Sequence, residues 1–267
     1  MEISQIIGYV LAVLIGVILG LLGSGGSILS VPILVYVMSI EPTLATAYSL
    51  FTVGFSALVG GIQKAKQKLV DFKKVALFGV PTLVSVFITR MLIVPKIPDI
   101  IYFTLDIQIK KSVLIMVVFA FVMIIASISM LKPIQEKETN NQKKSSYLAI
   151  FGQGLLIGFI AGFVGAGGGF LIIPALIYMA NTPMKIAVGS SLFIISSQSL
   201  FGFLGDIGGN QIIDWQLLLT FTFCSIIGIF IGNFISKKVD GEKLKIGFGW
   251  FILIMGIYII FKEITRS

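Results

Sequence analysis

Apolar residues form long continuous runs along this 267-residue chain, in place of the periodic patterns of soluble domains. The runs without Asp, Glu, Lys or Arg cover residues 3–40, 42–63, 75–89, 112–131, 145–184, 186–205, 215–236 and 246–261. A helix needs about 20 apolar residues to cross a bilayer. The pattern therefore predicts an all-α polytopic membrane protein.

Glycine clusters interrupt the two longest runs, at Gly23-Ser-Gly-Gly-Ser27 and at Gly165-Ala-Gly-Gly-Gly169. Consecutive glycines break an α-helix, because each costs about 1 kcal/mol relative to alanine there. Each of these runs must therefore contain two helices. We predict five helical segments in each half of the chain: 4–22, 28–39, 43–63, 74–94 and 111–131, then 147–164, 170–180, 185–205, 215–236 and 244–262.

The two halves are an internal duplication. Aligning residue 16 with residue 158 without a gap gives 14 identities over 36 positions. The register resumes one residue later, so that Arg90 is equivalent to Asn233. We predict an N-terminal repeat over 1–131, a cytoplasmic linker over 132–146 and a C-terminal repeat over 147–267.

Basic residues are distributed unevenly between equivalent loops. The loop after the third segment contains five lysines, whereas its counterpart at 206–214 contains two aspartates and no basic residue. Cytoplasmic loops gather Lys and Arg, so the equivalent loops should lie on opposite sides of the membrane. Inverted repeats are recurrent in secondary transporters, with a site near the midplane. The second segment of each half is short, so the sequence allows any number of membrane crossings from eight to ten.

Composition excludes most enzyme chemistry. Only 12% of residues are charged, against about 25% in soluble domains. The absence of histidine removes His-dependent catalytic triads, and the single cysteine, Cys224, cannot form an intramolecular disulfide. We expect no enzyme activity, cofactor or metal, although a sulfur-transfer enzyme using Cys224 is a remote alternative. The net charge of +8 lies mostly in loops and indicates topology, not nucleic-acid binding.

Each glycine cluster precedes a short helix whose first turn directs free N–H groups and a positive dipole end towards the break. This geometry binds anions, and two such ends could converge on one substrate. The alternative is that the glycines only allow close helix packing. The candidate substrate-binding positions in the clusters are Ser24, Gly25, Gly26, Ser27, Gly167, Gly168 and Gly169.

Polar side chains within the apolar runs supply further candidates. Ser49 and Ser191 are equivalent in the duplication, and Ser190 precedes the second of them. Their hydroxyls could donate to substrate oxygens or could bond to their own helix backbone. Arg90 is the only charge that interrupts an otherwise apolar segment, so we predict that it binds an anion unless it extends to the interface. Asn233 is included as its equivalent.

The duplicated motifs resemble the TauE/SafE family of sulfite exporters. The resemblance rests on Gly162-Phe-Val-Gly-Ala-Gly-Gly-Gly-Phe-Leu-Ile-Ile-Pro174 and Ala187-Val-Gly-Ser-Ser-Leu-Phe193, and on their degenerate copies Gly20-Leu-Leu-Gly-Ser-Gly-Gly-Ser-Ile-Leu-Ser-Val-Pro32 and Ala45-Thr-Ala-Tyr-Ser-Leu-Phe51. It extends through Val70-Asp-Phe72 and Ile213-Asp-Trp215. The resemblance implies a prokaryotic inner-membrane transporter for sulfite, sulfonates or related organic anions.

Our leading hypothesis is a secondary transporter, acting as an exporter by alternating access in the cytoplasmic membrane of a prokaryote. The alternative is an anion channel that uses the same glycine-break site. The expected partners are a small anion and the lipid bilayer, without nucleic acid. A homodimer is a further assembly to test.

Overall fold

The computed structural model describes residues 3–23, 25–104, 107–131, 147–165, 168–178, 182–207, 213–236 and 241–266. Two predicted site residues, Ser24 and Gly167, lie outside these ranges, as does the predicted linker 132–146.

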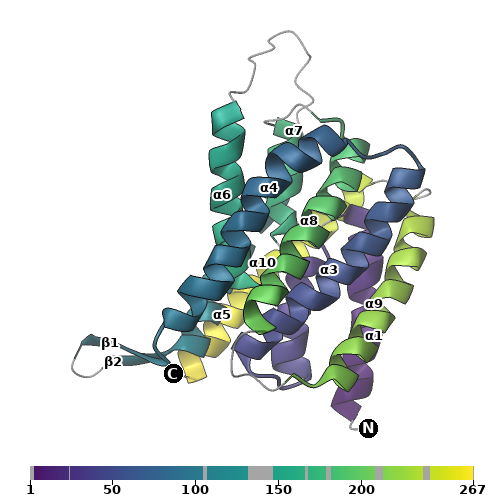
Figure 1. The fold of residues 1–267 in the computed structure, drawn as a ribbon. Helices are drawn as coiled ribbons and strands as arrows, with labels where there is room; N and C mark the ends of the chain where they lie inside the picture. The colour runs from purple at the N-terminus through teal and green to yellow at the C-terminus, as the bar shows by residue number, and fades with distance from the viewer. Residues whose placement is uncertain are drawn as a thin grey trace.

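The described residues are mostly helical, and every predicted segment overlaps one or more helices (Figure 1). Residues 179–180 of the predicted segment 170–180 lie outside the described ranges. The first half contains α1 (Ile3–Leu22), α2 (Ser27–Pro32), the π-helical turn η1 (Ile33–Val37), α3 (Pro42–Lys66), α4 (Phe72–Ile88), the π-helical turn η2 (Thr89–Ile93), the 3-10 turn η3 (Val94–Lys96) and α5 (Lys111–Leu131). The second half contains α6 (Tyr147–Val164), α7 (Gly169–Tyr178), α8 (Met184–Ile207), α9 (Trp215–Ile235) and α10 (Gly241–Arg266).

A β-hairpin departs from the all-α prediction. Strands β1 (Ile100–Thr104) and β2 (Ile107–Lys110) pair antiparallel, with Ile101 opposite Ile109. Pro95 and Pro98 prevent the preceding helix from continuing through this segment. The strands that follow are rich in β-branched and aromatic residues, which favour extended backbone.

Equivalent pairs of helices make equivalent contacts. Helix α1 runs parallel to α9, and Gly16 of α1 packs against the backbone at Ser225. Helix α6 runs parallel to α4, and Gly158, the equivalent of Gly16, packs against Thr82, the equivalent of Ser225. Small residues allow this close approach of helix backbones. The duplication in sequence therefore appears again in the packing.

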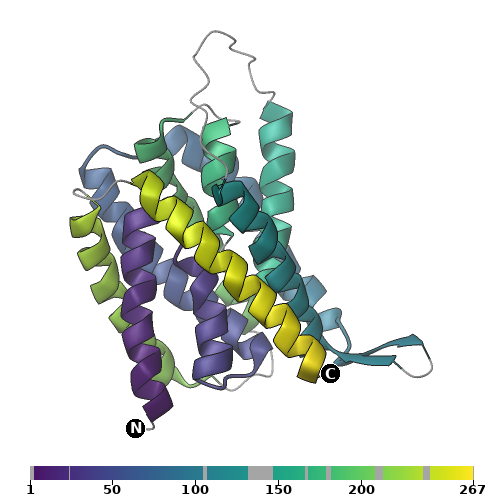
Figure 2. The ribbon, with the colours of Figure 1, turned by 180° about the vertical axis from the view of Figure 1, so that it is seen from behind.

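Two pairs of equivalent helices pack antiparallel to each other. In the α3–α8 pair, Gly54 contacts Leu200 and Gly61 contacts Phe193, so residue numbers rise in one helix as they fall in the other. The α5–α10 pair behaves in the same way, because Gly249 lies against Met130 whereas Gly256 lies against Met123. Figure 2 shows α5 and α10 side by side.

The bundle has two distinct ends. Both chain termini and the β1–β2 hairpin lie at one of them, which we call the hairpin end (Figures 1 and 2). The loop between α3 and α4 lies at the other end, which we call the lysine end because this loop and its flanks contain Lys64, Lys66, Lys68, Lys73 and Lys74. Helix α3 runs from the hairpin end to the lysine end, and α8 runs back.

The protein is a multi-pass membrane protein. Within the described residues, six helices are long and apolar enough to cross a bilayer, and α3 and α8 are the most buried of them. The outer helices expose large apolar side chains, such as Phe223, Phe230 and Phe234 of α9, where lipid would cover them. Since Ser27–Val37 and Phe151–Val164 are shorter apolar helices, the predicted eight to ten crossings remain a prediction.

Candidate functional site

The first glycine of each cluster has left-handed backbone. Gly23 follows α1 with φ 76°, and Gly165 follows α6 with φ 73°. The Gly23 N–H donates to Leu19 O at 2.7 Å, and the Gly165 N–H donates to Ala161 O at 2.9 Å. Each glycine is therefore bonded to the helical turn before it. Left-handed backbone costs little only for glycine, so these two positions require it.

The surroundings of these two glycines are also equivalent. A methyl group on Gly23 would collide with Val188 of α8, and one on Gly165 would collide with Thr46 of α3 and with Arg90. Val188 and Thr46 occupy the second turns of two antiparallel helices, so they lie near opposite ends of the bundle, roughly 30 Å apart along the helix axis. Each glycine therefore adjoins its own cluster of side chains.

The hairpin-end cluster consists of Thr46, Arg90, Gly165 and Asp206. Arg90 is only 1% exposed, and its Nη1 donates to Thr46 Oγ1 at 3.0 Å. The same Nη1 lies 3.2 Å from Asp206 Oδ2 and 3.5 Å from Oδ1. Arg90 is thus buried between α3 and α8 as half of an ion pair and does not extend to the interface.

The other side of the Arg90 guanidinium has no hydrogen-bond partner among the described residues: Nε and Nη2 are both buried and unpaired. In a guanidinium group, these two nitrogens present parallel N–H bonds on one edge. Buried donors without partners are costly, and this edge matches two oxygens of one oxyanion. It is the described feature best suited to hold an anion.

Arg90 lies in a π-helical turn. The wider turn η2 is closed by the N–H of Val94, which donates to Thr89 O, five residues back. Single π-helical turns inside helices often mark functional sites. The sequence predicted one regular helix over 74–94, because the apolar pattern does not distinguish π from α turns.

The lysine-end cluster consists of Gly23, Gln63, Val188 and Asn233, the equivalents of the hairpin-end residues. Asn233 is 5% exposed, and its Nδ2 donates to Gln63 Oε1 at 2.6 Å. Asn233 Oδ1 and Gln63 Nε2 have no partners in the part of the chain that the structure describes. A neutral amide pair therefore stands where the other end has an ion pair.

Sequence reasoning missed Gln63 and Asp206 as partners of Asn233 and Arg90. The signal was present, because the register that is shifted by one residue aligns Gln63 with Asp206 just as it aligns Arg90 with Asn233. Pairing across four helices requires knowledge of which helices touch, which the duplication alone does not provide.

The equivalent serines Ser49 and Ser191 have different partners. The Ser49 hydroxyl bonds to the Ser30 hydroxyl of α2, and both side chains are fully buried. Ser191 donates to Val188 O of its own helix at 2.9 Å. Ser49 therefore ties α3 to the short helix after the first break, whereas Ser191 makes the local bond that polar residues in helices commonly form.

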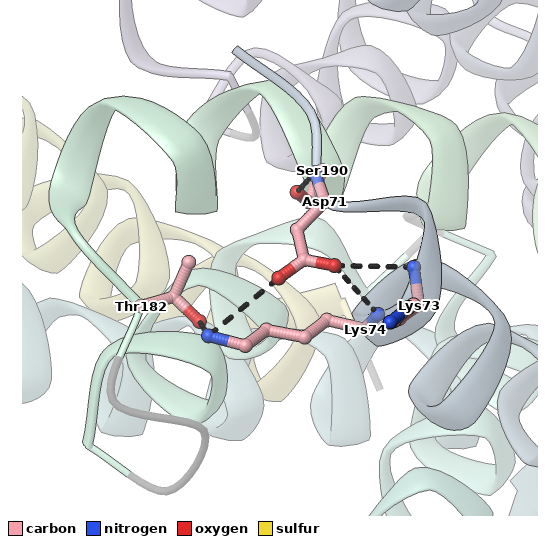
Figure 3. Close-up of polar contacts among 5 residues, drawn as sticks. All are labelled: Asp71, Lys73, Lys74, Thr182 and Ser190. Atoms are coloured by element: carbon pink, nitrogen blue, oxygen red, sulfur yellow. Dashed lines mark hydrogen bonds and ion pairs between the residues drawn. The ribbon is translucent and has the colours of Figure 1, made fainter. Parts of the chain in front are cut away.

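Ser190 lies at the lysine end in a capping arrangement (Figure 3). Its Oγ accepts the N–H of Asp71 at 2.9 Å, and the Asp71 carboxylate accepts from the backbone N–H groups of Lys73 and Lys74. Lys74 Nζ also lies 3.8 Å from Asp71 and donates to Thr182. Ser190 of α8 thus holds Asp71, the residue that caps the start of α4.

The glycine clusters differ at their fourth positions. Gly26 is right-handed with φ −62° and packs against Ile15 and Leu19 of α1. Its equivalent, Gly168, is left-handed with φ 57°, and a side chain there would meet Ala161 and approach Gln198.

Both short helices begin where the clusters end. Ser27 and Gly169 are the first residues of α2 and α7, and the carbonyls of Gly25, Gly26 and Gly168 accept the first bonds of these helices. Helices α2 and α7 contact each other. The candidates Gly25, Gly26, Ser27, Gly168 and Gly169 therefore belong to the turns that join the helices of each pair.

Comparisons with known proteins agree with the fold. Residues 9–259 match the family model described as "Sulfite exporter TauE/SafE". A "Probable membrane transporter protein" of Xylella fastidiosa is 29% identical over 261 residues, which cover 94% of this chain and 92% of the relative. "Probable membrane transporter protein YunE" of Bacillus subtilis is 24% identical, over 98% of this chain and 99% of the relative.

A shorter match links the chain to a plant protein. "Sulfite exporter TauE/SafE family protein 5" of Arabidopsis thaliana is 26% identical over 121 residues, which cover 43% of this chain and 27% of the relative. No solved structure matches the chain. With a family match over nearly its whole length, the chain belongs to the sulfite exporter TauE/SafE family and is a membrane transporter of that type.

Proposed function

We propose that this transporter exports small sulfur-containing or organic anions, such as sulfite or sulfonates, across the cytoplasmic membrane of a prokaryote by alternating access. The observation that carries the proposal is the edge of the buried Arg90 guanidinium that has no hydrogen-bond partner in the described part of the chain. A sulfite or sulfonate group offers two oxygens at once to such an edge. In surroundings without water, the resulting charge-assisted bonds are stronger than neutral ones.

Inverted repeats over 1–131 and 147–267 provide the framework for alternating access. The antiparallel packing of α3 against α8 and of α5 against α10 supports this relation, because both pairs are equivalent in the duplication. The lysine-rich loop supports a cytoplasmic lysine end. Arg90 would then bind its anion near the external side.

Flux measurements in proteoliposomes test the proposal. Wild-type protein should move radiolabelled sulfite with saturation and should show counterflow, which an anion channel would not. Arg90→Gln should lower the rate at least about a hundredfold, because the edge that binds the anion is removed. Lys96→Gln is the matched control, since it removes one exposed positive charge from η3 and should leave the rate unchanged.

Two results would contradict the proposal. Continuous electrodiffusion in the wild type would favour the channel over the transporter. A folded Arg90→Gln variant with wild-type flux would show that the anion does not use Arg90.

A further inference from the structure

We propose that Asp206 is a built-in counter-ion that competes with the transported anion for Arg90. This inference rests on the proposed function and adds how the anion is released. It assigns to Asp206 a role in the transport cycle beyond neutralising a buried charge.

The two members of the ion pair have unequal access to water. The Arg90 side chain is 1% exposed, whereas that of Asp206 is 14% exposed. Asp206 lies in the last turn of α8, which ends at Ile207. The carboxylate can therefore move towards water by a change of side-chain rotamer, while the guanidinium stays buried and needs an anion beside it.

The ion pair is also incomplete. Asp206 contacts only Nη1, which it shares with Thr46, and leaves Nε and Nη2 unpaired within the described residues. An anion can bind the unpaired edge while Asp206 is still in place. Two negative charges would then adjoin one positive charge, so their repulsion would weaken the hold of Asp206. Lys111 at the start of α5 is a second positive charge that acts on Asp206.

Release follows by the reverse exchange. When Asp206 returns to Arg90, it restores the neutral pair and drives the bound anion out at the hairpin end. The lysine end has Gln63 at the equivalent position, which carries no charge to compete with an anion. The two ends thus differ in whether the protein provides a resident competitor.

Asp206→Asn tests the competition directly. Purified variants in nanodiscs are titrated with methanesulfonate, and transport of the same anion is measured in proteoliposomes. Loss of the competing charge should lower the dissociation constant about tenfold and should slow turnover, because release is no longer assisted. Asp214→Asn is the matched control, since it removes one carboxylate from the start of α9 and retains a side chain that can cap the helix.

A second variant covers the case in which Asp206→Asn does not fold. Asp206→Glu keeps the competing charge on a side chain that is one methylene longer, so the carboxylate can reach further along the guanidinium. It should raise the dissociation constant for methanesulfonate several-fold. A purely structural ion pair would affect thermal stability in these variants without moving the dissociation constant in opposite directions.

The outcomes separate the two proposals. If the wild type neither binds nor transports methanesulfonate or sulfite, the proposed function fails and this inference fails with it. If the wild type transports the anion but Asp206→Asn binds it no more tightly, only the competition is overturned. In the double variant Arg90→Gln/Asp206→Asn, the gain in affinity should disappear, because the competition requires Arg90.

Discussion

The two ends of the bundle have the same backbone arrangement and different chemistry. Gly165 and Gly23 differ by only three degrees in φ, and each packs against the second turn of the equivalent long helix. Beside Gly165, Arg90 and Asp206 form an ion pair. At the positions beside Gly23, the corresponding residues are the neutral Asn233 and Gln63. Duplication accounts for the shared framework, and substitutions at a few positions account for the polarity of the molecule.

The difference has an energetic reason. A buried ion pair costs desolvation energy that its own attraction only partly offsets, so a second buried pair would add a second cost. An anion that crosses the protein needs a strong partner at one level only, because tight binding at both ends would slow its release. An ion pair at the hairpin end and an amide pair at the equivalent positions of the lysine end therefore satisfy both requirements.

Making the two ends alike should have the largest effect. The double variant Arg90→Asn/Asp206→Gln copies the amide pair of the lysine end into the hairpin end. We expect proteoliposome flux to fall at least about a hundredfold, because the buried guanidinium that binds the anion is removed. Thermal stability should stay close to that of the wild type, since neither partner of the ion pair is left behind as an unpaired charge.

Single variants are the control for this experiment. Arg90→Asn alone leaves Asp206 buried without its partner and should melt at a lower temperature than the double variant. If the double variant still transports at the wild-type rate, the ion pair is not part of the anion pathway and the contrast between the ends has no functional meaning.

The helices were largely predictable from the sequence, because a membrane protein must place long apolar runs in lipid. The segments 111–131 and 147–164 have the predicted bounds. The β1–β2 hairpin was not predicted, because it lies between apolar runs, where hydropathy carries little information. The π turn at Thr89–Ile93 was missed because hydrogen-bond spacing leaves no mark on hydropathy.

The candidate site was predictable only in part. An intramembrane arginine can be identified in any sequence, and Arg90 is buried as that reasoning requires. Its partners Thr46 and Asp206 come from α3 and α8, so they follow from tertiary packing. Ser190 also depends on tertiary packing: its bond to the backbone N–H of Asp71 could not be read from its motif, and its predicted contact with substrate stays a prediction.

Alanine at the two left-handed glycines should lower flux by an intermediate amount. The two variants should also show whether the two ends of the bundle contribute differently to transport. Gly165→Ala and Gly23→Ala both impose a backbone penalty of about 1–2 kcal/mol. At Gly165, the new methyl group also displaces Arg90 and Thr46, so flux should fall at least about tenfold. At Gly23 it meets Val188, and flux should fall only a few-fold.

Melting temperature and flux must be measured on the same preparations. Equal losses of stability with unequal losses of flux are the expected result. Equal losses of flux would show that the two breaks contribute alike, despite the charge beside only one of them.

The smallest effects are expected at the equivalent pair Ser190 and Tyr48. Ser190 Oγ accepts the N–H of Asp71, and Tyr48 OH accepts the N–H of Asp214 at 2.6 Å. Both bonds hold the residue that caps the following helix, α4 or α9. Because Asp71 is half-buried and Asp214 is exposed, Ser190→Ala and Tyr48→Phe should each cost only about 0.5–1.5 kcal/mol of stability.

Transport kinetics decide whether Ser190 also meets the substrate. If its hydroxyl serves only the cap, Ser190→Ala should leave the KM for sulfite within twofold of the wild-type value, as should Tyr48→Phe. A rise of KM in Ser190→Ala alone would place a substrate contact at the lysine end. The anion would then meet a hydroxyl at the lysine end before it reached Arg90. The two ends would then differ in the order in which the anion meets them.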